Sequence, residues 1–165
     1  EPLPLIEKFI SNAKVLVAGS TWEDDEIELI HYVKKHPEIK FIIAPHEIDN
    51  ASLSDVKKEF GQSVFYAEMS AGKELPPGAH VLIIDNIGML SRIYRYATVS
   101  YIGGGFNSDG IHNTLEAAVY AVPVIFGPEY EKFAEANDLI ELGGGFSIDN
   151  ALQLEKLLDD FFADQ

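Results

Sequence analysis

The stretch "KVLVAGSTWEDDEIELIHYVKK", residues 14–35, decides the fold. Residues 14–20 are mostly apolar, which predicts a short strand that is buried on both faces. An acidic run follows where a helix would begin, and apolar residues recur behind it at helical spacing, so we expect a helix over 23–35. A buried strand that leads directly into an amphipathic helix is the repeating unit of a parallel α/β sheet.

The same unit recurs to the end of the chain. Further strands are expected over 40–45, 63–67, 80–85, 99–104, 123–127 and 145–148. Further helices are expected over 51–60, 88–97, 112–121, 131–141 and 150–162. The alternation predicts an α/β fold with a doubly wound, mostly parallel, Rossmann-like sheet that carries helices on both faces. Residues 1–165 are interpreted as a single domain, in which residues 1–12 derive from a linker and feed a short helix.

Composition is that of an ordinary globular protein, and it narrows the choice of ligands. The 165 residues carry a formal net charge of −15 and include no cysteine. A charge of this sign repels nucleic acids and anionic membrane surfaces, so no nucleic-acid partner is expected. Disulfide and thiolate chemistry is excluded. No stretch approaches the roughly 18–20 apolar residues of a membrane span.

Two loops with ligand-binding potential follow the first two strands, at the sheet edge where open α/β sheets bind their ligands. Ser20 and Thr21 offer hydroxyl groups after the first strand, although the acids behind them equally suit a plain helix start. Pro45 and His46 lie where the second strand gives way to its loop. His46 either donates to an anion or a sugar hydroxyl, or is a solvated loop residue.

The third loop follows the strand over 80–85. Asp85 and Asn86 end this strand and Gly88 opens the next helix, so free main-chain amides here can bind an anion or read the edge of a base. Alternatively, the two polar side chains only cap that helix.

The fourth loop, "GGGFNSDGIHNTLEAA" over 103–118, carries the strongest pattern. The glycines at 103–105 lack Cβ atoms, so a ligand can approach the main chain. Glu116 is placed to accept two hydrogen bonds from a ribose diol. Alternatively, Asn113 and Glu116 form a capping box at the start of the following helix.

Common cofactor and metal motifs are missing. The glycines do not follow the first strand, so they are not a dinucleotide fingerprint, and no Walker-type or GxSxG motif occurs. No spacing of His, Asp and Glu predicts a metal site, and the acids at 23–26 are interpreted as a solvated face. We therefore expect neither a metal nor another cofactor.

Taken together, the four loops resemble the C-terminal half of the bacterial 3-deoxy-D-manno-octulosonic acid (Kdo) transferases of lipopolysaccharide assembly. The stretches that carry the likeness are "AGSTWEDDE", "APHE", "IDNIGMLSRIYRYA", "YIGGGFNSDGIHNTLEAA" and "PVIFGPEYEKFAEA". Their order and spacing match the family over nearly the whole chain. The most specific part is the cluster of His112, Asn113 and Glu116.

This resemblance implies that the chain is one half of a two-domain GT-B glycosyltransferase, the half that binds the donor CMP-Kdo. The family transfers Kdo to a lipid A precursor at the cytoplasmic face of the bacterial inner membrane, with inversion at the anomeric carbon. The N-terminal half is expected to supply the membrane anchor, the acceptor surface and the carboxylate base. No catalytic residue is therefore expected in this chain, which should be inactive alone and should act without a metal.

The resemblance also assigns roles to loop residues. Glu116 matches the ribose-binding glutamate of the family, and the main chain of the stretch around Gly88 meets the nucleotide. Amides near Gly88, Gly104 and Gly105 are expected to assist the departure of CMP. The full predicted substrate-binding set is Ser20, Thr21, Pro45, His46, Ile87, Gly88, Met89, Gly104, Gly105, His112, Asn113 and Glu116.

Three positions depart from the family pattern, one of which is Ile84-Asp85, where the family usually has Gly-Asp. The family often has Pro-Arg-His where residues 45–47 of this chain are Pro-His-Glu, so a basic side chain that would meet the phosphate or the sugar carboxylate is missing. Many members have Asn-Pro-Leu-Glu-Pro where residues 113–117 are Asn-Thr-Leu-Glu-Ala. The threonine costs little, because proline is only favoured at a first helical position.

Two other functions stay open at this point. Another GT-B enzyme that uses a UDP-sugar, either a UDP-sugar transferase or a UDP-GlcNAc 2-epimerase, would share the glycine loop and the ribose-binding glutamate. A non-catalytic, doubly wound binding module is the third option. It is disfavoured because a receiver-like domain needs a lysine directly after a late strand, and the fifth and sixth expected strands are followed by none.

Overall fold

The computed structural model describes residues 1–163 and places seven parallel strands among them in one sheet. The strands are β1 (Val15–Thr21), β2 (Lys40–Pro45), β3 (Ser63–Phe65), β4 (Val81–Ile83), β5 (Val99–Ile102), β6 (Val124–Phe126) and β7 (Gly145–Ser147). Their order across the sheet is β3-β4-β2-β1-β5-β6-β7. Apart from the added edge strand β3, this is the Rossmann-like order, and the predicted fold class is confirmed.

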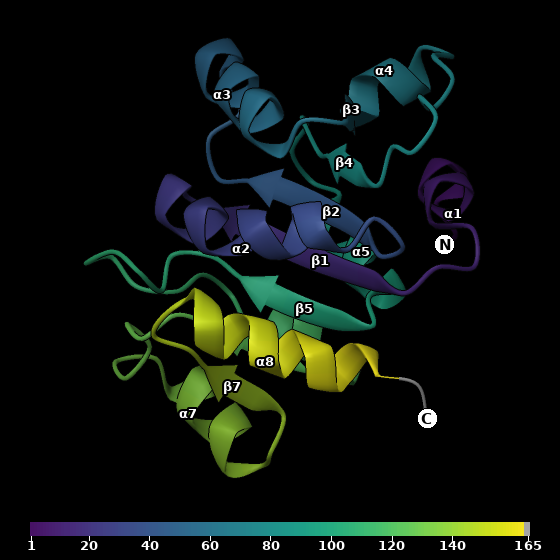
Figure 1. The fold of residues 1–165 in the computed structure, drawn as a ribbon. Coiled ribbons are helices and arrows are strands. Elements are labelled where there is room, and N and C mark those ends of the chain that lie inside the picture. The colour runs from purple at the N-terminus through teal and green to yellow at the C-terminus, as the bar shows by residue number, and fades with distance from the viewer. Residues whose placement is uncertain (164–165) are drawn as a thin grey trace.

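Helices connect the strands and cover both faces of the sheet (Figure 1). They are α1 (Pro4–Ile10), α2 (Glu23–Lys35), α3 (Asn50–Phe60), α4 (Tyr66–Ser70), α5 (Leu90–Ile93), α6 (Leu115–Ala118), α7 (Ala134–Glu141) and α8 (Ala151–Phe162), with a 3₁₀ turn, η1, at Tyr94–Tyr96. None of the helices within residues 1–163 combines the length and the apolar character that crossing a membrane requires.

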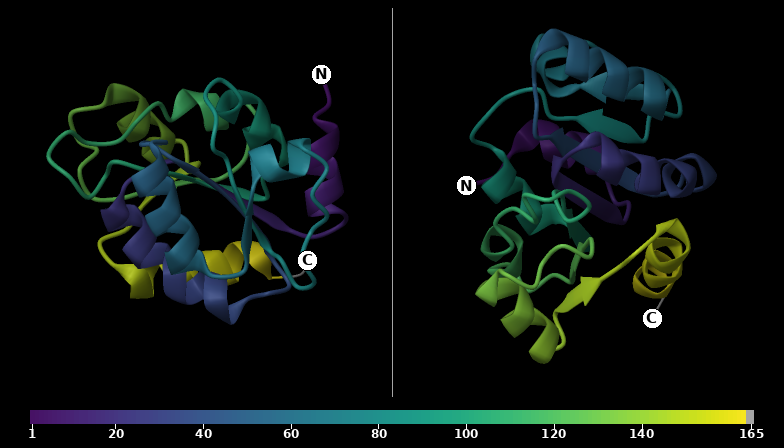
Figure 2. Two further views of the ribbon diagram at one scale, coloured as in Figure 1. Left: turned by 90° about the horizontal axis from the view of Figure 1, so that it is seen from above. Right: turned by 90° about the vertical axis from the view of Figure 1, so that its left-hand side faces the viewer.

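Helices lie on both sides of the sheet (Figure 2), and a separate hydrophobic core lies against each of its faces. Because side chains alternate along a strand, Leu16 of β1 points into one core and its neighbour Val17 into the other. The first core is closed by α2, α3 and α8, and the second by α1, η1 and the shorter helices. Both faces of the strands are therefore buried, as their apolar sequence predicts.

Residues 1–12, interpreted from the sequence as linker-derived, contribute to the second core. Ile6 and Phe9 of α1 are 0% and 1% exposed. The amide of Leu3 donates to the hydroxyl of Tyr96 at 2.8 Å, and that hydroxyl donates to Glu7 at 2.8 Å. These contacts hold α1 against the face of the sheet that the second core covers.

Two predicted helices are much shorter than expected. The helix expected over 88–97 is only α5 followed by η1, because Gly88 has a φ of 98° and cannot begin a helix. The helix expected over 112–121 is reduced to α6. Its start is delayed because the amide of His112 donates to the carbonyl of Gly103 at 3.1 Å, and Ala121, at a φ of 59°, turns the chain away.

The order in which strands are added to the sheet reverses between β1 and β5. These two strands pair side by side although about 80 residues separate them. From β1 the chain builds outward through β2 on one side, and from β5 it builds outward through β6 on the other. Ser20 interrupts the pairing of β1 with β2 and has a φ of 55°. The loops at this reversal therefore leave the sheet on opposite faces and open a space above the strand ends.

Candidate functional site

Three aromatic rings, which we call the ring cluster, meet at the carboxyl ends of the central strands. Trp22 follows β1, His46 follows β2 and His112 lies in the loop after β5. The centroids of Trp22 and His46 are 4.2 Å apart in a stacked arrangement, and those of His46 and His112 are 4.7 Å apart. Pairing of β1 with both β2 and β5 brings the three loops together. Two predicted site residues, His46 and His112, are thus neighbours.

His112 is held as a neutral imidazole. The indole Nε1 of Trp22 donates to His112 Nε2 at 3.4 Å, so the proton of the neutral ring lies on Nδ1. Burial, followed by the proximity of His46, lowers the pKa of His112 below its usual value. At neutral pH this side chain therefore offers a directed N–H donor rather than a positive charge.

Asp25 ties the loop after β1 to the glycine loop after β5. Its Oδ2 accepts the backbone amides of Trp22 at 2.8 Å and of Gly104 at 3.0 Å, and its Oδ1 accepts the hydroxyl of Tyr101 at 2.6 Å. Its side chain is fully buried, and burial raises its pKa. Asp25 is three residues beyond the helix-capping position, where a carboxylate can turn back onto the amide at the helix start.

Glu26 is a second buried acid of the same helical turn. It is 4% exposed, and its Oε2 accepts the hydroxyl of Thr21 at 2.8 Å. Burial raises the pKa of Glu26 to about 7. The prediction of a solvated acidic face is therefore wrong for Asp25 and Glu26, because both carboxylates bond to groups that the strand ends present. The hydroxyl of Thr21, a predicted ligand group, is already donated within the protein.

The glycines at 103–105 make room for the protein's own loops. A Cβ atom at Gly103 would collide with the backbone of Ser20 and Thr21 at the end of β1, and one at Gly105 with the backbone of Gly127. Gly104 has a φ of 96°, a conformation that favours glycine, and its amide donates to Asp25. The expectation that the Gly104 amide assists a leaving group is therefore wrong, since that N–H is engaged.

Asn113 and Glu116 lie together but do not form the predicted capping box. Asn113 Oδ1 accepts the amide of Leu115 at 2.9 Å, and Asn113 Nδ2 donates to Glu116 Oε1 at 3.5 Å. Because α6 begins only at Leu115, Glu116 is its second residue, and the side chain of the N-cap residue, Thr114, makes no capping bond. The Glu116 carboxylate is half-buried, and the long bond to Asn113 is its one hydrogen bond within residues 1–163. It is therefore available to a ligand.

The loop after β4 is divided between the surface and the interior. Asp85 accepts an amide of α4 at 3.0 Å, so it caps a different helix from the expected one. Asn86 Nδ2 donates to Met89 Sδ at 3.2 Å. Ile87 is 86% exposed and Gly88 is also exposed, whereas Met89 is 8% exposed. Of the three predicted site residues in this loop, Ile87 and Gly88 are open to a ligand, and Met89 packs into the core.

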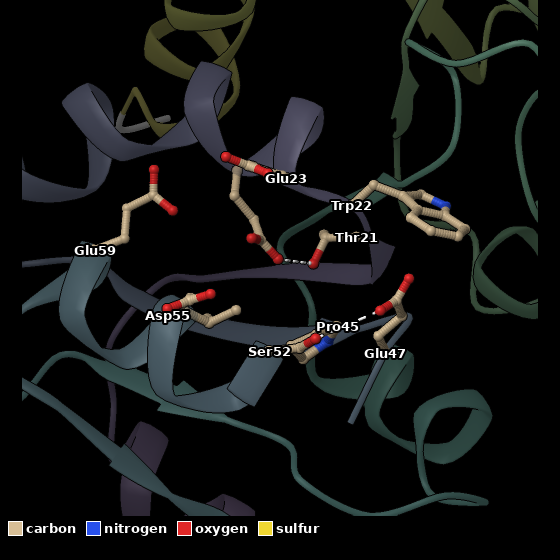
Figure 3. Close-up of a pocket in the computed structure, with 10 residues that line it drawn as sticks. Thr21, Trp22, Glu23, Pro45, Glu47, Ser52, Asp55 and Glu59 are labelled. Carbon is tan, nitrogen blue, oxygen red and sulfur yellow. Dashed lines mark hydrogen bonds between the residues drawn. The ribbon is translucent and has the colours of Figure 1, made fainter. Parts of the chain in front are cut away.

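A pocket of about 270 Å³ next to the ring cluster is strongly acidic (Figure 3). It lies between α2 and α3, and its walls carry five acids and no base: Glu23, Glu26, Glu47, Asp55 and Glu59. Pro45, a predicted site residue, lines it as well. The ring of Trp22 points away from Glu23, Asp55 and Glu59, whereas Glu47 lies on the same side as the ring (Figure 3). An anionic ligand is therefore repelled from this pocket.

Sequence reasoning missed three side chains that build the site, Trp22, Asp25 and Tyr101. Asp25 had a detectable signal, since an acid three residues after a helix start is a capping pattern. The contacts of Trp22 and Tyr101 depend on strand pairing across the sheet, which no local pattern encodes. Within the described part of the chain, no group of three or more His, Asp or Glu side chains is arranged to hold a metal ion.

The proteins that are similar to this chain include two curated relatives and one solved structure. It is 29% identical over 155 residues to a 3-deoxy-D-manno-octulosonic acid transferase of Aquifex aeolicus, which covers 90% of the chain and 42% of the relative. A protein of the same name from Rickettsia felis is 30% identical over 138 residues, with 80% of the chain and 29% of the relative covered. The C-terminal CMP-Kdo binding domain of WaaA from Acinetobacter baumannii has the same fold, with a TM-score of 0.76 and 21% identity over 96% of this chain and 89% of that domain.

The chain thus spans less than half of the length of these curated relatives. No family model matches it. The relatives nevertheless share one name, and the fold match covers almost the whole chain, in agreement with the resemblance carried by the four loops. The chain therefore belongs to the Kdo transferase family, in which it corresponds to the C-terminal domain.

Proposed function

We propose that this chain is the donor-binding half of a glycosyltransferase that transfers Kdo from CMP-Kdo to a lipid A precursor. The observation that carries the proposal is the convergence of His112, Asn113 and Glu116 at the reversal of strand order, where doubly wound sheets bind nucleotides. The name of the Acinetobacter baumannii domain, a CMP-Kdo binding domain with the same fold, supports it.

In this proposal Glu116 accepts hydrogen bonds from the ribose hydroxyls. Its carboxylate is half-buried and bonded only weakly to Asn113, so it can exchange that contact for two charge-assisted bonds to a diol. Ile87 and Gly88 expose the edge of the neighbouring loop, where the main chain can meet the nucleotide.

The ring cluster takes the anionic part of the donor. His112 carries a directed N–H donor, and the exposed ring of His46 lies against it. These imidazoles replace the basic side chain that the family often has after the second strand, and they replace the engaged Gly104 amide in assisting the departure of CMP. Acids in the pocket next to the ring cluster repel the donor's phosphate and carboxylate and so favour a single orientation.

The remaining parts of the proposal concern the whole enzyme. A GT-B active site lies between two domains, so an N-terminal domain would supply the acceptor surface, a membrane anchor and the carboxylate base. Transfer would then invert the anomeric carbon, need no metal and take place at the cytoplasmic face of the bacterial inner membrane. This chain alone would bind the donor without turning it over.

Calorimetric titration of the chain with CMP, UMP and UDP tests the proposal. We expect CMP to bind more tightly than UMP or UDP. We expect Glu116→Ala to weaken CMP binding at least about tenfold, because a carboxylate that bonds a diol contributes roughly 1.5–3 kcal/mol per bond. The matched control is Glu141→Ala, which removes an exposed acid at the end of α7 and should leave the affinity unchanged.

Three results would contradict this assignment in different ways. A preference for UDP would favour a UDP-sugar enzyme. Tight CMP binding by Glu116→Ala would remove the ribose role from this residue. No gain in melting temperature with any nucleotide would favour a non-catalytic module, since a ligand at a hundredfold excess over its Kd stabilises a protein by about 2.7 kcal/mol.

A further inference from the structure

Tyr94 is a buried tyrosine whose hydroxyl makes no hydrogen bond within residues 1–163. The residue lies on η1 and is 1% exposed, with its ring in the second core. The other two fully buried tyrosines use their hydroxyls, since Tyr101 bonds Asp25 and Tyr32 bonds Asp159, and the half-buried Tyr96 bonds Glu7 and Leu3. A hydroxyl at the end of so deeply buried a side chain is normally paired with a protein atom or with water, so the lack of a protein partner requires a reason.

The Tyr94 hydroxyl is the part of this residue that still meets solvent. Every fully enclosed side-chain nitrogen or oxygen of the described residues has a hydrogen-bond partner. The Tyr94 hydroxyl has none, so it is not fully enclosed, and the small exposure of the residue lies at this atom. The side chain is therefore buried up to its tip, and the tip reaches an opening.

That opening lies at the carboxyl end of β1. The hydroxyl presses against Gly19, and any Cβ atom at position 19 would collide with it. Gly19 directly precedes Ser20, where the loop at the strand reversal begins. The glycine thus leaves space for a phenol oxygen at the floor of the candidate site.

Glu116 is the charged side chain that acts on this hydroxyl. Burial raises the pKa of Tyr94 well above its usual value, and the negative charge of Glu116 raises it further. The phenol therefore keeps its proton over the whole range in which proteins are studied. A protonated O–H donor therefore lies within electrostatic reach of the Glu116 carboxylate.

We propose that the Tyr94 hydroxyl donates a hydrogen bond to a pentose hydroxyl of the bound nucleotide and makes the site selective for ribonucleotides. A sugar hydroxyl both donates and accepts, so it can give its proton to Glu116 and receive one from Tyr94. A deoxy sugar would leave the phenol without a partner, and sites that hydrogen-bond a hydroxyl reject analogues that lack it. This inference rests on the proposed function, because it takes the pentose to lie at Glu116.

The test combines Tyr94→Phe with CMP, 2′-deoxy-CMP and 3′-deoxy-CMP in calorimetric titrations. Tyr94→Phe should bind CMP about tenfold more weakly than the wild-type chain. For one of the two deoxy nucleotides, the loss of affinity relative to CMP should be about tenfold smaller in Tyr94→Phe than in the wild type. That difference identifies the sugar hydroxyl that Tyr94 contacts.

Thermal unfolding separates a ligand-binding role from a structural one. Tyr94→Phe removes an unpartnered oxygen and keeps the ring, so its melting temperature should equal or exceed that of the wild type. Tyr96→Phe, on the same 3₁₀ turn, is the matched control. It removes bonds to Glu7 and Leu3, so it should lower the melting temperature and leave CMP binding unchanged.

Wild-type affinity of Tyr94→Phe for CMP, together with weakened binding by Glu116→Ala, would overturn this inference and leave the proposed function intact. Failure of the wild-type chain to bind CMP would overturn both. Equal affinity of the wild-type chain for CMP and both deoxy nucleotides would also overturn the inference, and that measurement needs no variant at all.

Discussion

Asp25 shows how much a single residue can organise. Its two oxygens hold three donors that come from the start of α2, from β5 and from the glycine loop. The ring cluster and the glycine loop keep their relative position because both are attached to this carboxylate. A buried charge that is satisfied by three hydrogen bonds is stable, whereas its removal strands all three donors.

We predict that Asp25→Ala and Asp25→Asn differ sharply in stability. Asp25→Ala leaves the Trp22 and Gly104 amides and the Tyr101 hydroxyl without acceptors, so the free energy of unfolding should fall by about 3 kcal/mol or more. In Asp25→Asn, the amide oxygen can accept both backbone amides and the amide nitrogen can donate to the tyrosine oxygen, so the loss should be about 1 kcal/mol or less. Urea denaturation measures both, and equal losses would show that the three bonds do not hold the loops.

At the scale of elements, the glycine loops act as spacers between strand ends. The loops after β5 and β6 are in backbone-to-backbone contact at Gly105 and Gly127. Side chains at these two positions would prevent such a close approach. This packing brings the fourth loop down onto the sheet and shortens α6, because His112 is bonded to Gly103 before the helix can begin.

Gly105→Ala should therefore disturb the site through the fold. Its Cβ atom would overlap the backbone of Gly127, which cannot move like the end of a flexible side chain. Overpacking of this kind costs about 1–3 kcal/mol or more, and CMP binding should weaken along with stability. In the control Gly144→Ala, the added Cβ meets atoms only at 3.9 Å and beyond, so both quantities should stay near the wild-type values. Unchanged melting temperature in Gly105→Ala would refute the spacer role.

The long strand and helix elements were predictable because each carries its own pattern. Residues 14–35 alternate from an apolar run to an amphipathic helix, and α2 and β1 lie where that pattern predicts. The short helices were not predictable. The intrinsic preferences of residues such as Leu115 and Ala117 favour a helix. The start of α6 is delayed by the hydrogen bond from His112 to the glycine loop, which the local sequence does not reveal.

Some features of the candidate site were likewise predictable from the sequence and others were not. His46, His112, Asn113 and Glu116 follow strands, so the rule that parallel strands end at one edge was enough to bring them together. The engagement of Thr21 by Glu26 and of Gly104 by Asp25 was not accessible, because each bond joins a loop to a helix face whose rotation is set by the core. Patterns thus located the site, and packing decided which of its groups remain free.

At the scale of the whole molecule, an excess of acid makes stability depend on pH. The chain has a formal net charge of −15, and several of its carboxylates crowd the pocket between α2 and α3. Glu26 is the most buried of them, and burial raises its pKa to about 7 from an ordinary value of 4.5. Between these two pH values, Glu26 is therefore protonated in the folded state and ionised in the unfolded state.

This difference predicts that the chain becomes less stable as the pH rises. The stabilisation by protonated Glu26 is complete below its unfolded pKa of 4.5 and is lost as the pH passes the folded value of about 7. The loss should be on the order of 2–3 kcal/mol across that window. Glu26→Gln keeps a neutral side chain at every pH, so it should flatten the profile, whereas the control Glu28→Gln should not. Urea unfolding at about pH 5 and about pH 8 measures the difference, and a wild-type profile that rises with pH would contradict the assignment.

The pairing of β1 with β5 also governs when the site can form during synthesis. Loops that begin near residues 20 and 103 meet only after the second of these strands has docked beside the first, and such distant pairing is slow compared with the local formation of helices. A nascent chain that ends before β5 would already hold Trp22 and His46, but Asp25 would lack two of its three donors, Tyr101 and Gly104, and Glu116 would be missing. Ribosome-bound intermediates should therefore gain nucleotide affinity in one late step, after the fifth strand has left the exit tunnel.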